Sequence, residues 1–119
     1  MIIYYFAILF SAKGWYIGGP AESCDTACHG HSLTCNEKGY EDHYSDVDSS
    51  EKVFNLIKKL GGKMLAESCN RANFPAVPVF KSDVCAYSDT TEMFDCSSQP
   101  LPIKENKQRL CYCQQIEGK

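Results

Sequence analysis

The chain has 119 residues, a formal net charge of −3 at pH 7 and 8 cysteines. This length predicts one domain, and the mild acidity argues against a nucleic-acid-binding protein, because no basic stripe is present to displace counterions from phosphate. An even number of cysteines in a short chain predicts disulfide bonds and an oxidising compartment, either extracellular or in the secretory lumen. These cysteines are Cys24, Cys28, Cys35, Cys69, Cys85, Cys96, Cys111 and Cys113.

Residues 1–14 have the composition of a secretory signal peptide. Residues 2–10 are an uninterrupted apolar run, and Ala12 and Gly14 are small residues at the positions that a signal peptidase inspects. We therefore expect residues 1–14 to be removed and residues 15–119 to form a cysteine-rich domain. The apolar run is too short for a stable membrane span, which needs about 20 residues. The alternatives for this segment are a buried first strand and a truncated gene model.

A short apolar stretch at residues 15–17 opens the predicted domain and is followed by a turn containing glycine and proline. Ser23 is a favourable N-cap for a short helix over Cys24–His29, because its hydroxyl can accept a hydrogen bond from an unpaired amide of the first turn. The two cysteines of this helix are four residues apart, so both thiols lie on one of its faces. Gly30 is expected to end the helix, and residues 32–35 are expected to form a strand.

Residues 41–50 are polar and acidic and predict a loop. Residues 48–51 form a capping-box pattern with Asp48 in the cap position, and this pattern starts the clearest helix of the chain. The apolar stripe of that helix repeats at helical spacing and consists of Val53, Ile57 and Leu60, with Phe54 and Leu56 beside it. Gly61 and Gly62 are expected to end the helix.

The chain after Cys69 is predicted to consist of short extended segments separated by turns. Pro75 and Pro78 disfavour a central strand in this region, because proline has no amide proton to donate to a neighbouring strand. Residues 77–80 and 84–87 are predicted short strands, and residues 99–102 are expected to be an irregular loop. The predicted fold is a small disulfide-rich α+β domain with two short helices and a few short antiparallel strands.

Residues 110–114 form the predicted last strand, in which Cys111 and Cys113 point to the same face. A bond between these two cysteines is disfavoured, because residues two apart in a strand lie near the upper limit of disulfide reach. Eight cysteines otherwise leave the pairing open. Our hypothesis is that Cys24 and Cys28 bond to this strand pair and join the two ends of the chain. A bond between Cys24 and Cys28 would contradict it.

Two motifs resemble metal sites but are incomplete. The Cys-x3-Cys spacing of the first helix, next to His29 and His31, fits one half of a zinc site, but the only other close cysteine pair has a poorer spacing. Residues 46–50 resemble the start of a calcium loop, whose sixth and twelfth positions require glycine and glutamate but are Glu51 and Ile57. We therefore expect no metal and no cofactor.

Residue types used in catalysis do not form a recognised pattern. One alternative is a metal or acid–base site made by three histidines and their acidic neighbours, namely His29, His31, His43, Glu41, Asp42 and Asp46. Histidine at a helix end is more ordinarily a cap, because its positive charge complements the helix dipole. No serine lies in a Gly-x-Ser-x-Gly motif, and the predicted disulfides leave no cysteine as a nucleophile. We expect no catalytic residues.

Aromatic side chains are the candidate binding residues. Tyr40, Tyr44, Tyr87 and Tyr112, together with an exposed Trp15, offer stacking surfaces for a sugar or a protein partner. Such residues are enriched at interfaces because they combine a rigid apolar ring with a polar tip. The alternative is that these rings fill a small core.

The cysteines and several neighbouring residues form one ordered pattern, which is Ser23-Cys24-x3-Cys28, Leu33-Thr34-Cys35, Cys69, Pro75, Pro78, Cys85, Cys96 and Arg109-Leu110-Cys111-Tyr112-Cys113. Over residues 19–113 this pattern resembles the cysteine-rich C-terminal region of the α-1,6-mannosylglycoprotein 6-β-N-acetylglucosaminyltransferases, luminal Golgi enzymes that branch N-glycans. The polar residues 36–40 replace an apolar and aromatic stretch of that family, and the chain has no room for its nucleotide-sugar-binding folds. The resemblance implies a shared module in glycan-associated surroundings, without catalytic residues.

These observations predict a secreted or luminal, non-catalytic binding or structural module whose partner is a glycan or an extracellular protein. One alternative is a fragment or accessory unit of an N-acetylglucosaminyltransferase-like enzyme. Another is a secreted effector or inhibitor that presents an exposed loop such as residues 99–108. No nucleic-acid partner is expected, and the oligomeric state stays open.

Overall fold

The structure, a computed structural model, describes residues 12–116, so most of the predicted signal peptide lies outside the described part. The elements in chain order are β1 (Gly14–Ile17), α2 (Cys24–His29), β2 (Thr34–Cys35), α3 (Glu37–Asp42), the 3₁₀ helix η1 (Tyr44–Asp46), α4 (Ser50–Lys59), β3 (Asn70–Arg71), β4 (Val79–Lys81), β5 (Val84–Tyr87), the 3₁₀ helix η2 (Ile103–Glu105) and β6 (Gln108–Gln114). None of the described helices has the length and apolar character needed to cross a bilayer.

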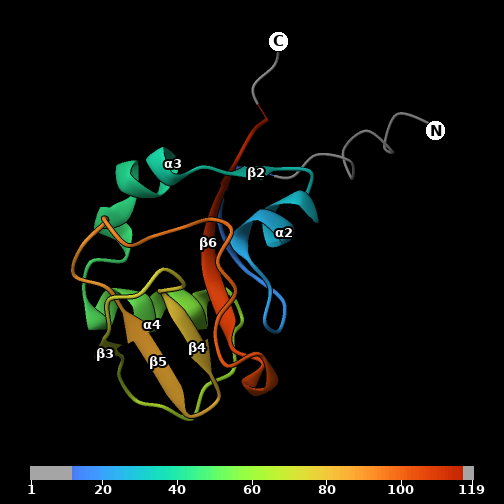
Figure 1. The fold of residues 1–119 in the computed structure, drawn as a ribbon. Helices are drawn as coiled ribbons and strands as arrows, with labels where there is room; N and C mark the ends of the chain where they lie inside the picture. Colours follow the sequence, from blue (N-terminus) through green and yellow to red (C-terminus); the bar gives the residue numbers. More distant parts are fainter. Residues whose placement is uncertain (1–11, 117–119) are drawn as a thin grey trace, which may run out of the picture.

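The last strand, β6, is the centre of the sheet (Figure 1). β1 pairs antiparallel with one edge of β6, so that Gly14 lies opposite Cys113. On the other edge β2 pairs near the C-terminal end of β6 and β4 pairs near its beginning, where Val79 lies opposite Arg109. β5 pairs with β4, and β3 adds a short parallel pairing to β5. The α+β class is confirmed, whereas the expectation of only antiparallel strands is wrong at β3.

The predicted first helix is confirmed with the bounds Cys24–His29. The Ser23 hydroxyl accepts a hydrogen bond from the amide of Thr26 at 3.1 Å, as an N-cap does. Gly30 ends the helix in a right-handed conformation, and Ser32 takes the left-handed backbone conformation two residues later, with φ 61°. The helix therefore ends at Gly30 as expected, but the residue of the following turn that takes the left-handed conformation is Ser32.

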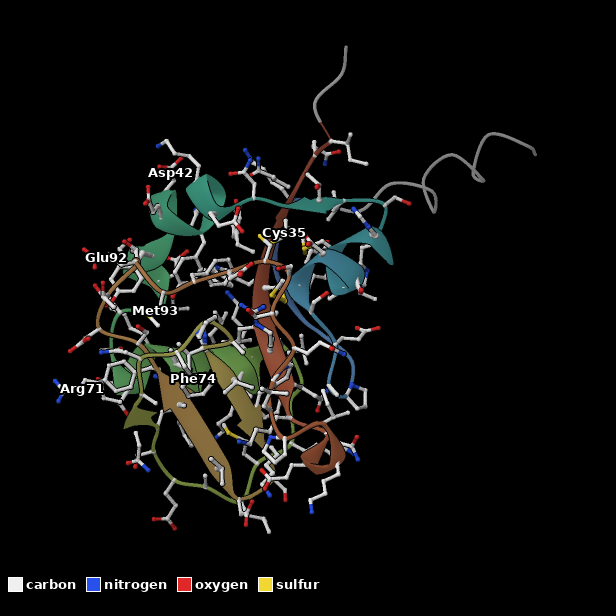
Figure 2. The ribbon with its side chains drawn as sticks, in the orientation of Figure 1. Cys35, Asp42, Arg71, Phe74, Glu92 and Met93 are labelled. Atoms are coloured by element: carbon white, nitrogen blue, oxygen red, sulfur yellow. A yellow bond between two sulfur atoms is a disulfide. The ribbon has the colours of Figure 1, made fainter. Side chains whose placement is uncertain are left out.

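Two disulfides join α2 to β6, which are Cys24–Cys111 and Cys28–Cys113. Their Cα separations of 5.4 and 5.3 Å lie in the ordinary range for disulfides. The hypothesis that the helix pair bonds to the strand pair is therefore confirmed. The other two bonds are Cys35–Cys96 and Cys69–Cys85, and no cysteine is free. Figure 2 labels Cys35 on β2, which pairs with β6.

The helix α4 is confirmed, but it begins one residue later than the capping-box pattern indicates. Ser49 is the N-cap, because its hydroxyl accepts a hydrogen bond from the Lys52 amide at 3.3 Å. Asp48 instead forms an ion pair with the Lys52 ammonium group at 3.0 Å. Gly61 ends the helix in the left-handed region, with φ 92°, where glycine is favoured because it has no Cβ.

The helix α3 was not predicted, so the described part has three α-helices rather than two. Asn36 is its N-cap and accepts a hydrogen bond from the Gly39 amide at 3.1 Å. Gly39 disfavours a helix locally, but a Cβ at this position would collide with the side chain of Gln114. The glycine therefore allows α3 to pack against the end of β6.

The predicted strands are largely confirmed, with changes at their ends. β5 has the predicted bounds Val84–Tyr87, and β6 begins at Gln108, two residues before its predicted start. β4 begins at Val79 rather than at residue 77, because Pro78 has no amide proton with which to pair. The predicted strand at residues 32–35 is reduced to Thr34–Cys35.

The main core lies between β6, α2 and α4. Val53 and Ile57 of α4 are fully buried in it, and Leu110 of β6 and Phe80 of β4 lie in the same cluster. Leu60, the third residue of the predicted stripe, is 36% exposed, because it follows the last residue of the helix. The four disulfides lie in or against this cluster, so covalent bonds and apolar packing stabilise the same region.

Candidate functional site

Two of the four tyrosines proposed as a binding surface are buried. Tyr40 is 1% exposed and Tyr112 is 5% exposed, although Tyr112 still lines a pocket of about 310 Å³ together with Asp42 and His43. Tyr40 stacks on Phe94 with ring centroids 3.8 Å apart, and Tyr112 stacks on His43 at 3.9 Å. Burial raises the pKa of Tyr40. Tyr40 therefore packs in the main core, and Tyr112 packs on β6 against His43, which joins α3 to η1.

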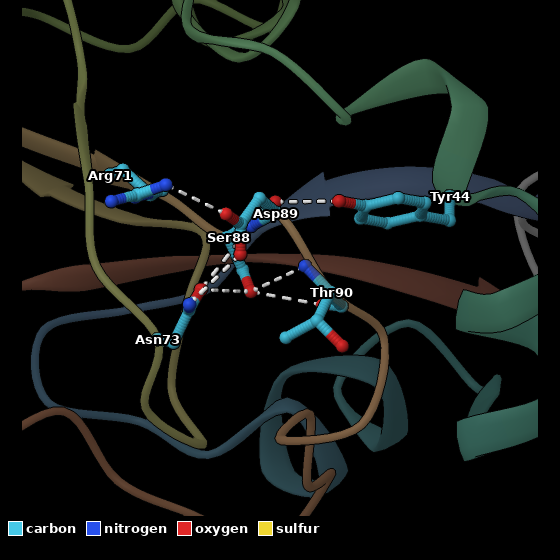
Figure 3. Close-up of polar contacts among 6 residues, drawn as sticks. All are labelled: Tyr44, Arg71, Asn73, Ser88, Asp89 and Thr90. Carbon is cyan, nitrogen blue, oxygen red and sulfur yellow. Dashed lines mark hydrogen bonds and ion pairs between the residues drawn. The ribbon is translucent and has the colours of Figure 1, made fainter.

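Tyr44 and Tyr87 are half-buried. The Tyr44 hydroxyl donates a hydrogen bond to the carbonyl oxygen of Ser88 at 2.7 Å (Figure 3), which fixes η1 to the segment after β5. Tyr87 packs against the main core. The four tyrosines therefore serve mainly to connect elements, and the sequence pattern did not distinguish this use from ligand binding.

Trp15, in contrast, lines an open groove of about 510 Å³ between β1, η1 and α4. We call this the Trp15 groove, and its lining residues are Trp15, Ser45, Asp46, Lys52, Asn55, Leu56 and Lys59. The indole is half-buried and lies edge-on to Tyr112, with ring centroids 5.4 Å apart. The buried rings of Tyr40 and Tyr112 therefore pack edge-on against the indole that lines this groove.

Hydrogen bonds and an ion pair hold the walls of the Trp15 groove in place. The indole Nε1 of Trp15 donates to Oδ2 of Asp46 at 3.0 Å, which ties β1 to η1. The Lys52 ammonium group donates to the carbonyl oxygen of Ser45 at 2.8 Å and pairs with Asp48 at 3.0 Å, which ties α4 to η1. The groove is therefore formed before any ligand binds.

The helix α4 supplies polar groups to the groove. Lys52, Asn55 and Lys59 are spaced at i, i+3 and i+7, so they lie along one face of α4. Asn55 and Lys59 are exposed. An amide can both donate and accept hydrogen bonds, whereas an ammonium group donates only. A half-buried indole beside an amide, a carboxylate and ammonium groups suits a ligand with both apolar faces and many hydroxyls.

The alternative acid–base site is not assembled by the contacts of the described residues. Asp42 forms an ion pair with Lys38 at 2.8 Å, and Asp46 accepts the hydrogen bond from Trp15. His43 is stacked on Tyr112, and His31 lies against the Tyr16 ring with centroids 4.2 Å apart. The Cys-x3-Cys motif that resembled one half of a zinc site has no free thiols for a metal, because Cys24 and Cys28 are in disulfides.

A polar cluster joins the ends of β3 and β5 (Figure 3). The Asn73 Oδ1 atom accepts hydrogen bonds from the Ser88 hydroxyl at 2.8 Å and from the Asp89 amide at 3.2 Å, and its Nδ2 donates to Asp89 at 2.9 Å. Arg71 pairs with the same carboxylate at 3.0 Å. The hydrogen bond from Asn73 and the charge of Arg71 hold the pKa of Asp89 below its usual value. These hydrogen bonds fix the segment that follows β3 to the segment that follows β5.

Replacing Asn73 with alanine should raise the pKa of Asp89, because the largest cause of its depression is removed. A depressed carboxyl pKa contributes stability that is present above the unfolded pKa and is lost as the pH falls through the folded pKa. The Asn73→Ala protein should therefore lose less stability on acidification than the wild type. NMR titration of the Asp89 carboxyl carbon checks this. Asn70→Ala is the control, and an unchanged pKa in Asn73→Ala would contradict the assignment.

Arg109 is the polar residue whose role the sequence did not reveal. It shares one face of β6 with Cys111 and Cys113 and is fully buried. Its Nη1 atom donates to the carbonyl oxygens of Asp95 and Ser98, both at 2.8 Å, and its Nη2 atom donates to that of Pro75 at 3.1 Å. Burial lowers the pKa of Arg109 to about 10, so it is cationic at neutral pH.

Two of the three residues whose carbonyl groups Arg109 holds, Pro75 and Ser98, line another cavity. This cavity has a volume of about 380 Å³, and we call it the Leu101 pocket. Its lining residues are Phe74, Pro75, Ala76, Ser98, Gln99, Leu101 and Lys107, none of which lines the Trp15 groove. Figure 2 labels Phe74 in the segment that precedes β4.

Comparison with known proteins leaves the chain without a family. No family model matches the sequence, and none of the curated proteins compared with it matches either. The four disulfides place the chain among the covalently stabilised domains that are typical of extracellular and luminal proteins.

Proposed function

We propose that the chain is a secreted or luminal, non-catalytic binding module that binds a glycan in the Trp15 groove. The observation that carries the proposal is the half-buried Trp15, which is fixed to Asp46 and lies in an open groove beside the exposed Asn55. The resemblance inferred from the cysteine pattern would imply the same class of partner.

The chemistry of a sugar matches the groove. The face of an indole carries negative charge density, which attracts the weakly positive C–H groups on one side of a sugar ring. Hydroxyl groups at the ring edge can then donate to Asp46 and exchange hydrogen bonds with the Asn55 amide. Because the walls are already fixed by internal hydrogen bonds, little conformational entropy is lost on binding.

A shallow groove with one aromatic ring implies weak binding to a single glycan. An affinity of about 0.1–1 mM is reasonable for a few hydrogen bonds and one stacked ring. Linking several copies of the module raises the apparent affinity, because each later contact is intramolecular. The initial search should therefore use a tetrameric form of the oxidised chain on a glycan array.

The decisive measurement is a titration of each array hit against the monomeric chain. Trp15 is the only tryptophan, so intrinsic fluorescence reports on the groove itself. We expect Asn55→Ala to weaken binding about 5- to 10-fold, which corresponds to the loss of one hydrogen bond. Trp15→Phe should weaken it as well, because the Nε1 bond to Asp46 is lost, and this variant is titrated by NMR because it has no tryptophan fluorescence.

Glu51→Ala is the matched control for Asn55→Ala, because Glu51 is exposed on the same helix and does not line the groove. Its affinity should equal that of the wild type. The proposal is overturned if no glycan is bound by the tetramer, or if the glycans that bind retain full affinity for both Asn55→Ala and Trp15→Phe. Conversion of a glycoside or sugar nucleotide by the chain alone would contradict the non-catalytic assignment.

A further inference from the structure

The pocket of about 310 Å³ that Tyr112 lines lies where α3 meets the C-terminal end of β6. We call it the Gln114 pocket, and six of its lining residues are Gly39, Asp42, His43, Tyr112, Gln114 and Gln115. Figure 2 labels Asp42, the last residue of α3. Lys13 lines the pocket as well, although it belongs to the segment that the sequence predicts to be removed. The pocket therefore keeps most of its walls whether or not residues 1–14 are removed.

The Gln114 pocket and the Trp15 groove are built by the same segments of the chain. His43 lines the pocket, and Ser45 and Asp46 of η1 line the groove. In the sheet, Tyr112 lies directly opposite Trp15. The Tyr112 ring lies edge-on to the Trp15 indole and is stacked on the His43 imidazole, with centroid separations of 5.4 and 3.9 Å. One aromatic ring therefore lies between the two cavities, and a ligand longer than one sugar can reach both.

The Gln114 pocket offers hydrogen-bonding groups rather than an open aromatic face. The Gln114 amide both donates and accepts, and so does a neutral imidazole such as that of His43. The Asp42 carboxylate accepts from Lys38 through Oδ1 at 2.8 Å, so its Oδ2 atom can accept from a ligand. Hydroxyl groups also both donate and accept. The pocket therefore suits a hydroxyl-rich ring that is bound by its edge.

These polar groups are held in position before any ligand binds. A Cβ on Gly39 would collide with Oε1 of Gln114, so the Gln114 amide lies directly against the backbone of α3. The His43 ring is held by its stacking on Tyr112, with the two ring planes 14° apart. Groups that are fixed in advance lose little conformational entropy when a ligand binds.

From these observations we infer that the Gln114 pocket is a second subsite for the same glycan, so that the ligand is an oligosaccharide rather than a single sugar. One sugar stacks on Trp15, and a neighbouring sugar is hydrogen-bonded by Gln114, His43 and Asp42. This inference rests on the proposed binding of a glycan in the Trp15 groove. It adds the minimum length of the ligand and the residues that recognise its second ring.

The test compares the best-binding oligosaccharide of the array with each single sugar that it contains, by titration of the oxidised chain followed by the fluorescence of Trp15. We expect the oligosaccharide to bind about 5- to 10-fold more tightly, as for one or two additional hydrogen bonds. Gln114→Ala should remove most of this difference and leave the affinity for the single sugar unchanged. A variant that was merely misfolded would bind both ligands less well.

Asp42→Ala is a second variant, at the exposed end of α3, and should also weaken the binding of the oligosaccharide alone. Glu41→Ala is the matched control, because Glu41 is exposed on the same helix and lines neither cavity. Its affinity for both ligands should equal that of the wild type.

The inference is overturned if a single sugar binds as tightly as the oligosaccharide, or if Gln114→Ala and Asp42→Ala both keep the full affinity for the oligosaccharide. In these cases a loss of affinity in Asn55→Ala would show that glycan binding in the Trp15 groove still holds. If neither the oligosaccharide nor a single sugar is bound, both the second subsite and the proposed function are wrong.

Discussion

Removing both disulfides that join α2 to β6 should unfold the domain, whereas removing either one should leave it folded. The comparison uses Cys24→Ala with Cys111→Ala, Cys28→Ala with Cys113→Ala, and all four substitutions together. Each single removal is expected to cost about 2–3 kcal/mol, and the joint removal about 6 kcal/mol. The larger loss is comparable with the whole stability of a small domain, which is about 5–15 kcal/mol.

The reason is the size of the ring that each bond closes in the unfolded chain. When one of these disulfides is intact, the other closes only a small ring made of residues 24–28 and 111–113, so it restricts the unfolded chain little. When both are absent, only Cys35–Cys96 connects these regions, and a much larger ring is opened.

Guanidinium chloride unfolding under oxidising conditions, followed by circular dichroism, measures the three variants against the wild type. The chain with all four substitutions should show no cooperative transition at 25 °C. A folded domain with a normal transition in that variant would show that packing alone stabilises the sheet. A single removal that unfolds the chain would contradict the ring argument as well.

Arg109→Met should destabilise the domain by about 3–5 kcal/mol, because it removes three charge-assisted hydrogen bonds that join distant segments in the core. The carbonyls of Pro75, Asp95 and Ser98 each lose a hydrogen bond from the guanidinium group. Those of Pro75 and Asp95 keep a backbone amide donor, whereas that of Ser98 loses the donor that Arg109 supplies. Arg109→Lys should cost nearly as much, because one ammonium group does not reproduce the fork geometry of a guanidinium group.

Arg71→Met is the matched control for Arg109→Met, because Arg71 is the other arginine of the chain and its side chain is 64% exposed. Its ion pair with Asp89 is on the surface, and its loss should cost less than about 1 kcal/mol. Urea unfolding of both variants gives the two free energies. A loss below about 1 kcal/mol in Arg109→Met would show that the carbonyls find other partners.

The elements that were predicted correctly are those with a strong local pattern. The stripe of Val53 and Ile57 and the cap at Ser23 depend on residues a few positions apart, so the sequence alone reveals them. The disulfides between α2 and β6 were predictable for a related reason, because a helix and a strand each present two cysteines on one face.

The features that were missed depend on contacts between distant segments. Gly39 disfavours a helix in the sequence, and only the folded structure shows that the side chain of Gln114 occupies the space where a Cβ would lie. The Trp15 groove requires Trp15 to meet Asp46, which lies 31 positions away, and nothing local in either segment indicates that pairing. The burial of Tyr40 could not be read from its polar surroundings in the sequence, because Phe94 covers it from another loop.

The position of β6 has a consequence for biosynthesis. β1, β2 and β4 all pair with this strand, and it carries Cys111 and Cys113, yet it follows all three of them in the sequence, so they are synthesised before the strand with which they pair. Because synthesis proceeds from the N-terminus, Cys24 and Cys28 are made 87 and 85 residues before their partners. A chain that folds in an oxidising compartment therefore holds these two thiols unpaired, or paired with other cysteines, until β6 has been made, and thiol–disulfide exchange converts any other pairing to the native one.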